Sequence, residues 1–259
     1  MIDFHDRVAV VSGVGPGLGR DLALTFAHAG ADIVLLSRTA SYLEEVASEV
    51  EQTGRKALCV PADITSSDDC ERVAAEAVGM FGHIDAIVHN AYVGLPFERL
   101  EEADLEVWRT MMDVNTFGAL RLTQAALPAM KERGGAIVFI NTQQIRRVFE
   151  ARGPYAISKA ALFTAAQVLA KELGRYRIRV NSVVVGWMDG PPLQRYFDEV
   201  AARDGIPVAE QRAAVAAMNP LGVIPSCSDP ANAALFLASD YAGSITGQSL
   251  DVNAGETCS

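Results

Sequence analysis

The chain has 259 residues, of which 50% are hydrophobic and 21% are charged, and this composition excludes a disordered or fibrous protein. Its 22 basic and 32 acidic residues give a formal net charge of −10 without any basic run, which argues against nucleic acid or an anionic membrane as a partner. The Cys and His residues lack metal-ligand spacing, and neither a signal peptide nor a membrane span is recognisable. We therefore expect a soluble, cytoplasmic protein without a metal site.

The first predicted elements are a buried strand over 8–11, a glycine-rich turn and a helix over 20–29. The turn reads Ser12-Gly13-Val14-Gly15-Pro16-Gly17-Leu18-Gly19. Small residues let the backbone approach a pyrophosphate, and the free N–H groups of a helix start favour its negative charge. The turn is therefore a candidate phosphate cradle, and a tight strand-to-helix turn without a ligand is the alternative.

A second strand, predicted over 33–36, ends at Ser37-Arg38, about twenty residues beyond the glycine turn. A carboxylate at this point would bind the ribose hydroxyls of NAD, whereas an Arg can neutralise a 2′-phosphate. The sequence offers Arg38 and no acid until Glu44, which favours NADP(H) over NAD(H). The alternative is that Arg38 stacks on adenine and NAD is still accepted.

Helices are predicted over 40–53 and 69–80, and strands over 57–61 and 86–89. Asp63, followed by Ile64, comes just after the first of these strands. Its carboxylate either bonds the adenine amino group or forms the N-cap of the next helix. The second strand runs into Asn90-Ala91, and His89 is assigned no role because a lone His is more often structural.

Apolar residues recur at helical spacing over 105–130, with Asn115 in the middle. Asn is a poor residue inside a helix because its amide competes for backbone groups, so Asn115 invites a functional explanation. A strand predicted over 136–140 then leads to Thr142, thirteen residues before Tyr155.

Tyr155 and Lys159 are four residues apart in a helix predicted over 155–173, so their side chains address the same small volume. A nearby amine favours the phenolate, and lowering a tyrosine pKa of ~10 by about three units takes roughly 4 kcal/mol. Such a Tyr exchanges a proton with an alcohol or a carbonyl near neutral pH. The alternative is an ordinary helix with a half-buried Tyr and a solvated Lys.

The last part of the chain contains a strand over 180–185 that leads to Gly186, a helix over 230–238 and a strand over 248–252. Between them, the segment at about 187–224 breaks the alternation and is predicted to be a substrate loop or lid with short helices. About seven strands alternate with six helices, which predicts a single α/β domain over 1–259: a doubly wound, Rossmann-type, mostly seven-stranded parallel sheet with helices on both faces.

With these residues in order, the sequence resembles the short-chain dehydrogenase/reductase family over essentially its full length. Ser12 to Gly19 resembles the T-G-x3-G-x-G loop, with Ser for Thr, and His89 to Tyr92 keeps the middle pair of N-N-A-G. Val114-Asn115 resembles the helix Asn of the family, and Tyr155-x-x-x-Lys159 its catalytic pair. Thr142 stands where Ser is usual, and Val185 to Met188 resembles P-G-x-I without its Pro.

The resemblance implies an oxidoreductase that transfers a hydride between a nicotinamide and a carbonyl or secondary alcohol. Tyr155 would pass the proton, Lys159 would hold the nicotinamide ribose and lower the pKa of Tyr155, and Thr142 would orient the substrate oxygen. Asn115 would anchor a water relay. The expected cofactor contacts are Gly13, Gly15, Gly17, Leu18, Gly19, Ser37, Arg38, Asp63, Ile64, Asn90, Ala91, Tyr155, Lys159, Gly186 and Met188.

The resemblance also implies a homotetramer or homodimer built from the helices Leu105–Met130 and Tyr155–Leu173. Two other functions stay open. One is a catalytically silent nucleotide-binding sensor, because Tyr92, Thr142, Val185 and Gly190 depart from the family pattern. The other is an NAD-dependent alcohol dehydrogenase of the same fold. The sequence does not identify the substrate beyond a small carbonyl or alcohol compound.

Overall fold

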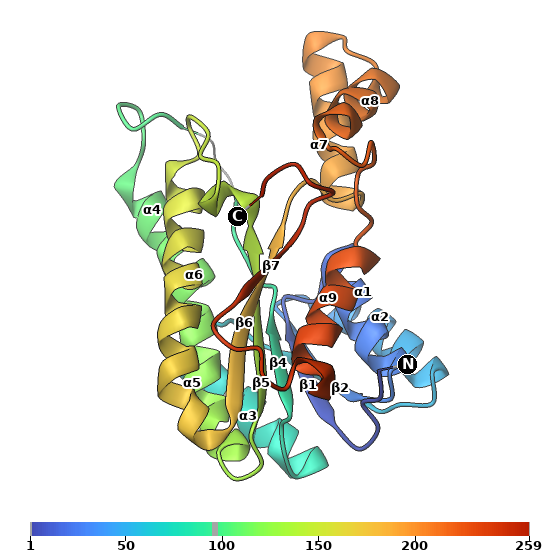
Figure 1. The fold of residues 1–259 in the computed structure, drawn as a ribbon, viewed down its shortest axis with the longest axis vertical. Coiled ribbons are helices and arrows are strands. Elements are labelled where there is room, and N and C mark those ends of the chain that lie inside the picture. The colour runs from blue at the N-terminus through green and yellow to red at the C-terminus, as the bar shows by residue number, and fades with distance from the viewer. Residues whose placement is uncertain (1, 95–97, 259) are drawn as a thin grey trace.

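The computed structural model describes residues 2–94 and 98–258, and it shows a seven-stranded parallel sheet between two layers of helices (Figure 1). The strands stand in the order β3-β2-β1-β4-β5-β6-β7, and every paired neighbour runs parallel. They are β1 (Val8–Ser12), β2 (Asp32–Ser37), β3 (Ala57–Pro61), β4 (Ala86–His89), β5 (Gly135–Thr142), β6 (Ile178–Val185) and β7 (Ser249–Val252). This order and direction confirm the predicted doubly wound, Rossmann-type fold.

Each face of the sheet is covered by helices that bury an apolar cluster against it. One face carries α1 (Leu18–His28), α2 (Ala40–Gln52) and α9 (Ser228–Ala238). The other carries α3 (Ser67–Phe81), α5 (Ala119–Met130) and α6 (Gly153–Leu173). Strands covered on both sides need apolar residues at every position, which is why β1 is buried throughout and reads as a continuous apolar run.

The helix predicted over 105–130 is interrupted. It consists of α4 (Leu105–Met112), a π-helix (Asp113–Gly118) and α5. A π-helix carries more residues per turn than an α-helix, so the chain widens at this point and changes the direction of its side chains. Asn115 lies in the widened turn and is buried there.

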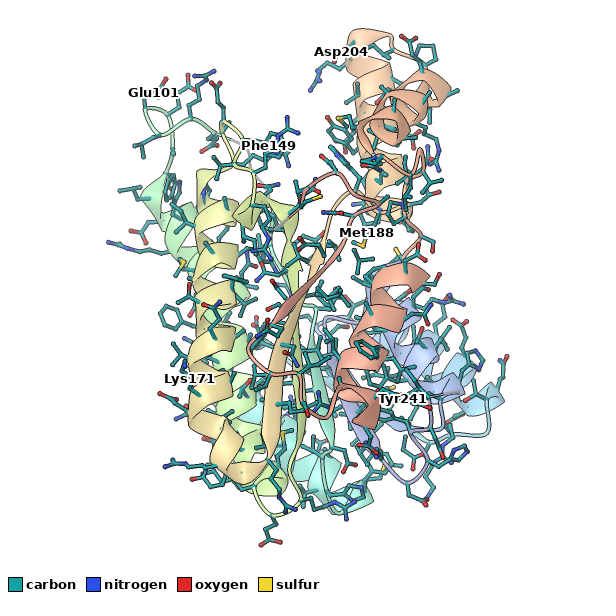
Figure 2. All side chains as sticks on the ribbon, in the orientation of Figure 1. Glu101, Phe149, Lys171, Met188, Asp204 and Tyr241 are labelled. Atoms are coloured by element: carbon teal, nitrogen blue, oxygen red, sulfur yellow. The ribbon has the colours of Figure 1, made fainter. Side chains whose placement is uncertain are left out.

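The segment predicted as a substrate loop contains two substantial helices, α7 (Pro191–Asp204) and α8 (Val208–Met218). We call these helices the arm. It rises beyond the carboxyl ends of the strands, with Met188 at its base and Asp204 at its tip (Figures 1 and 2). The arm has a small apolar cluster of its own, formed by Leu193, Phe197 and Val215.

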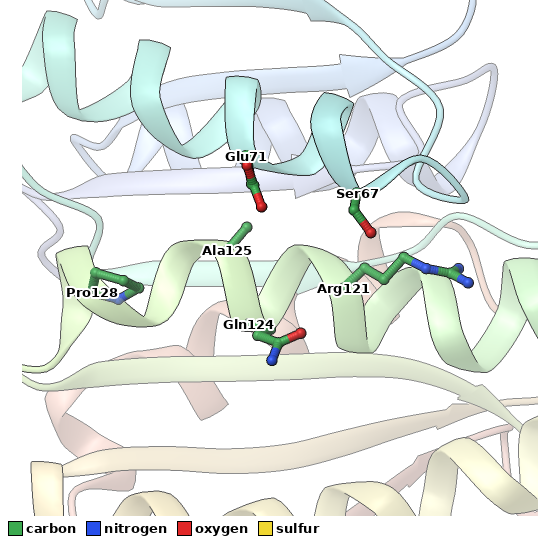
Figure 3. A pocket seen from close by; sticks show the side chains of 6 residues that line it. All are labelled: Ser67, Glu71, Arg121, Gln124, Ala125 and Pro128. Atoms are coloured by element: carbon green, nitrogen blue, oxygen red, sulfur yellow. The ribbon is translucent and has the colours of Figure 1, made fainter.

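A hollow of about 460 Å³ lies between α3 and α5 in one helical layer (Figure 3). It is lined by Ser67, Glu71, Arg121, Gln124, Ala125 and Pro128. None of these residues is a predicted site residue. Arg121 Nη2 donates to Asp113 Oδ1 at 2.6 Å, which ties α5 back to the π-helix. We interpret this hollow as a groove of helix packing.

Candidate active site

Tyr155 and Lys159 lie in the first turns of α6, which begins with Gly153 and Pro154. Pro suits the first turn of a helix because it has no N–H to leave unpaired. Lys159 is only 3% exposed, and its Nζ donates to the carbonyl oxygen of Ile140 in β5 at 2.9 Å. Burial lowers the pKa of Lys159 to about 8. The amine is thus fixed against the edge of the sheet at which β5 ends.

The pKa of the Tyr155 phenol is raised, whereas the sequence analysis predicted that Lys159 would lower it. Burial raises its pKa above the ordinary value, and the Tyr92 ring, whose centroid lies 6.2 Å away, acts in the same direction. A side-chain hydrogen bond with Thr142 and the charge of Arg152 lower the pKa by less. The expected lowering by Lys159 is not what determines this pKa, because desolvation dominates. A phenol whose pKa is raised keeps its proton at neutral pH and can donate it to a carbonyl oxygen.

Thr142 and Tyr155 lie together at the end of β5, where a hydrogen bond between their side chains lowers the pKa of Tyr155. The Tyr92 ring lies near both predicted side chains: its centroid is 6.2 Å from that of the Tyr155 ring and 5.8 Å from Lys159 Nζ. Tyr92 was noted in the sequence only as a departure from the family pattern. Its position beside both predicted catalytic side chains depends on the loop after β4, which no local pattern reveals.

Asn115 has structural partners for its whole amide. Its Oδ1 accepts from the N–H of Val93 at 2.7 Å, and its Nδ2 donates to the Val93 carbonyl and to Ser158 Oγ, both at 2.9 Å. The π-helix therefore aims Asn115 at the loop after β4 and at the turn of α6 that carries Lys159. The side chain braces the site; its predicted role in anchoring a water relay stays a prediction.

The glycine turn fits the phosphate group of a dinucleotide. A Cβ on Gly13 would lie 2.3 Å from the Ala91 backbone nitrogen, and one on Gly19 would lie 2.3 Å from the Gly13 oxygen. The turn is therefore packed tightly from beneath, where Asn90 Nδ2 donates to the Gly13 carbonyl at 2.8 Å. Gly15, by contrast, faces open space within the described residues.

The start of α1 is equally suited to an anion. Its N-cap is Gly17, at φ +95°, a conformation that favours glycine. No side chain among the described residues caps the amides that follow, at Leu18 and Gly19. These N–H groups and the helix dipole are therefore suited to bind an anion such as a pyrophosphate.

Arg38 and Asp63 line a common hollow of about 720 Å³, together with residues of α4 and the π-helix. Asp63 Oδ1 accepts from the Thr65 N–H at 2.9 Å and from Thr65 Oγ1 at 2.8 Å. These bonds, and more weakly the charge of Arg38, lower the pKa of Asp63. The alternative that Asp63 caps the next helix is wrong, because Ser66 is the N-cap of α3 and accepts from Asp69.

The remaining predicted cofactor contacts lie at the same edge of the sheet. Ser37 Oγ bonds the Thr39 carbonyl at 3.4 Å, and Ile64 packs against Gly118 of the π-helix. Gly186 follows β6, and Met188 packs against the apolar cluster below the arm.

Gln143 is a functional candidate that sequence reasoning missed. A Cβ on Gly186 would lie 2.8 Å from Gln143 Oε1, so the two residues are in close contact. Gln143 Nε2 donates to Glu256 Oε2 at 2.8 Å, which holds the C-terminal segment beside the Gly186 turn. The only sequence signal was its place directly after Thr142.

His89 is buried and stacked on Phe139, with ring centroids 4.9 Å apart. Its Nε2 bonds Thr123 Oγ1 at 2.9 Å, and burial lowers the pKa of His89 to about 3.

Over residues 2–94 and 98–258 we find no group of three His, Cys, Asp or Glu side chains arranged to hold a metal. Over the same residues, no helix has the length and apolarity that crossing a membrane requires.

A parallel sheet with a glycine cradle, and with a half-buried Tyr and a buried Lys at one edge, defines a dinucleotide-binding oxidoreductase. Comparison with known proteins specifies the family. Residues 13–257 match a family model described as enoyl-(acyl carrier protein) reductase. An uncharacterized oxidoreductase of Mycobacterium tuberculosis is 36% identical over 259 residues, covering 99% of this chain and 94% of that protein.

Two solved structures are similar over nearly the whole chain. L-Sorbose reductase from Gluconobacter frateurii, complexed with NADPH and L-sorbose, has a TM-score of 0.94 at 29% identity and covers 98% of each chain. A 7 alpha-hydroxysteroid dehydrogenase, complexed with NADH and 7-oxo glycochenodeoxycholic acid, has a TM-score of 0.89 at 30% identity and covers 98% of this chain and 95% of that one. The chain belongs to the short-chain dehydrogenase/reductase family.

Proposed function

We propose that this protein is an NADP(H)-dependent oxidoreductase that interconverts a carbonyl compound and a secondary alcohol, with Tyr155 as the acid and base. One arrangement carries the proposal: the phenol of Tyr155 bonds the Thr142 hydroxyl and lies one helical turn from Lys159, at the sheet edge that also carries the glycine turn. The relatives above share this family, and one was solved with NADPH and the other with NADH.

When bound, the nicotinamide supplies or accepts the hydride. The residues of this chain would bind and orient the cofactor and pass the proton. The amides at the start of α1 would hold the pyrophosphate, and Arg38 would bind a 2′-phosphate. Lys159 would bond the nicotinamide ribose, in place of its present bond to Ile140.

At the substrate, Thr142 and Tyr155 would both bond the reacting oxygen. In the reductive direction Tyr155 donates its proton to that oxygen as negative charge develops on it. The raised pKa of Tyr155 suits this direction, because the phenol stays protonated at neutral pH. The tilted rings of Trp187 and Tyr196, with centroids 5.9 Å apart, offer an apolar wall at the base of the arm.

A screen of ketones and secondary alcohols, followed by absorbance at 340 nm, tests this proposal with NADPH and NADH in parallel. We expect turnover with at least one compound and a higher kcat/KM with NADPH. A higher kcat/KM with NADH would make the protein an NAD-dependent alcohol dehydrogenase. Tight NADPH binding without turnover across the panel would make it a nucleotide-binding sensor.

We also propose that the protein forms a homodimer or homotetramer through α5 and α6. Phe117, Ile157 and Val168 are about half exposed, and Ile157 and Val168 lie three turns apart on one side of α6. Sedimentation velocity tests this proposal, and a monomer at micromolar concentration would contradict it.

All four cysteines are free, which supports a reducing compartment such as the cytoplasm.

A further inference from the structure

The segment Asn253–Thr257 follows β7 and is folded back on itself; we call it the strap. The chain after β7 runs toward the base of the arm and then turns back (Figure 1). Ala254 and Gly255 have left-handed backbone conformations, at φ +54° and +88°, which make this reversal sharp. Asn253, which is 4% exposed, closes the turn: its Nδ2 donates to the Thr257 carbonyl at 3.0 Å, and its Oδ1 accepts from the Gly255 N–H at 2.9 Å. The strap is therefore a preformed turn.

On one side the strap contacts Gln143, which directly follows Thr142. Gln143 Nε2 donates to Glu256 Oε2 at 2.8 Å. Because a carboxylate only accepts, this bond fixes the orientation of the amide, and Gln143 Oε1 faces the position of a Cβ on Gly186, at 2.8 Å. The same Cβ would lie 2.9 Å from Asn253 Cβ. Gln143, which is 5% exposed, and the strap are thus both packed against the turn after β6.

On its other side the strap contacts the end of the arm. The Leu221 N–H donates to the Ala254 carbonyl at 3.2 Å, and a Cβ on Gly255 would lie 3.1 Å from Pro220 Cγ. Pro220 and Leu221 follow α8 closely, where the arm returns to the body of the molecule. One short segment thus joins the residue after Thr142 to the end of the arm.

We propose that the strap sets the position of the arm relative to the reacting groups, and that Glu256 and Gln143 are the positioning residues that anchor it. The inference rests on the proposed function, because it treats the arm as a wall of the substrate site. Loss of the bond between them leaves a buried amide without its acceptor and weakens the hold of the strap. The arm then loses a fixed support at Leu221 and opens more often.

The reacting side chains are held by other contacts. Lys159 is bonded to Ile140, and Tyr155 is bonded to Thr142. A loosened strap should therefore weaken substrate binding more than it slows the chemical step.

The test is Glu256→Ala, followed by hydrogen exchange with and without NADPH. We expect amides over 191–221 to exchange about tenfold faster than in the wild type, because a hydrogen bond to a charged group changes an equilibrium by about tenfold or more. Glu256→Gln keeps an acceptor oxygen for Gln143 and should restore most of the slow exchange. With the ketone that the screen finds to be reduced fastest, KM should rise about three- to tenfold in Glu256→Ala, and kcat should stay within about twofold.

Glu172→Ala is the matched control, because it removes the same charge from an exposed position at the far end of α6. Exchange over 191–221 and KM should be unchanged in this variant. The double variant Gln143→Met with Glu256→Ala should exchange no faster than the faster single variant, because both changes remove the same bond.

Two results would overturn the proposal. One is equal exchange over 191–221 in Glu256→Ala and the wild type. The other is exchange that rises equally in the sheet, which would show that the bond stabilises the whole fold and not the arm. Additive effects in the double variant would also contradict it, since the two residues would then act separately.

Hydrogen exchange separates this inference from the proposed function, since it needs no turnover. If exchange over 191–221 is faster in Glu256→Ala and restored in Glu256→Gln while the wild type reduces no ketone, the strap stands and the proposed reaction falls. If ketones are reduced but this exchange is the same in Glu256→Ala and the wild type, the reaction stands and the strap falls.

Discussion

The helix α6, which carries Tyr155 and Lys159, and the arm are built differently. Along α6, buried residues recur from Pro154 to Leu173, and the helix is bonded to β5 through Lys159 and to the π-helix through Ser158. In α7 the buried residues are Leu193, Phe197 and Val200. The proposed proton chemistry thus rests on elements packed in the core of the molecule, whereas the proposed substrate wall rests on a segment with few buried residues. Rigid placement of reacting groups and an adaptable binding wall are separate requirements, and this fold assigns them to separate elements.

The largest expected effect comes from the rigid side of this comparison. Tyr155→Phe should lower kcat by about a thousandfold or more, because it removes the hydroxyl that is proposed to pass the proton. The dissociation constant for NADPH, measured by fluorescence, should stay within about twofold. Tyr176→Phe is the control, since Tyr176 follows the distant end of α6. Retention of a sizeable fraction of the rate in Tyr155→Phe would refute the assignment.

A matched pair of substitutions compares the stability of the two regions. Phe139 in the sheet and Phe197 in the arm are both almost fully buried. Phe139→Ala should lower the global free energy of unfolding by about 3 to 5 kcal/mol, as large-to-small changes in a core do. Phe197→Ala should chiefly increase local opening of 191–218, because the arm can open without the sheet.

Urea denaturation and hydrogen exchange measure these two effects. We expect faster exchange confined to 191–218 in Phe197→Ala, with a smaller shift of the urea midpoint than in Phe139→Ala. Equal losses of global stability would show that the arm and the sheet unfold as one unit. The contrast between a rigid and an adaptable region would then be wrong.

Arg38 tests the cofactor end of the rigid region. Arg38→Ala should lower kcat/KM for NADPH by about 10- to 100-fold, because a charge-assisted bond to the 2′-phosphate is lost. The value for NADH, which lacks this phosphate, is the internal control and should change much less. A parallel loss with both cofactors would contradict the preference for NADP(H).

The smallest expected effect is a dependence of stability on pH. Burial lowers the pKa of Lys159 to about 8 in the folded protein, whereas the unfolded chain keeps the ordinary value of 10.5. Above pH 8 the folded state therefore releases its proton first, and the cost of burying the charge disappears. Relative to Lys159→Met, the wild type should gain roughly 1 kcal/mol of stability between pH 7.5 and pH 9. Urea titrations at both pH values measure this gain, and a constant difference would contradict it.

Much of the fold could be predicted because a parallel strand that is buried on both faces appears in the sequence as a short apolar run. Val8 to Val11 and Val183 to Val185 are apolar at every position, since helices cover both faces of the sheet. The helix start at Gly153 was missed by two residues, although Pro154 is a typical first-turn residue. The two helices of the arm were predicted only as short helices, because few of their residues are buried and they leave no long apolar stripe.

The chemistry of the site was harder to predict, since it depends on contacts between distant segments. The partner of Lys159 is Ile140, nineteen residues away, and Asn90 braces Gly13 from seventy-seven residues away. The direction of the Tyr155 pKa shift depends on burial by the folded chain, which spacing alone does not express. No local sequence pattern singles out Tyr92, Gln143 or Arg152. Only the folded chain brings these residues next to predicted site residues.

The π-helix at Asp113–Gly118 has a consequence for how this sequence can vary. A widened turn holds one residue more than regular winding needs, so deleting a single residue there would let α4 and α5 join as one unbroken helix. Such a shortened chain would swing the amide of Asn115 away from Val93 and Ser158 by about a quarter turn. A gene that loses this codon would thus encode a more regular helix, but Asn115 would no longer hold the segment of α6 that carries Tyr155 and Lys159.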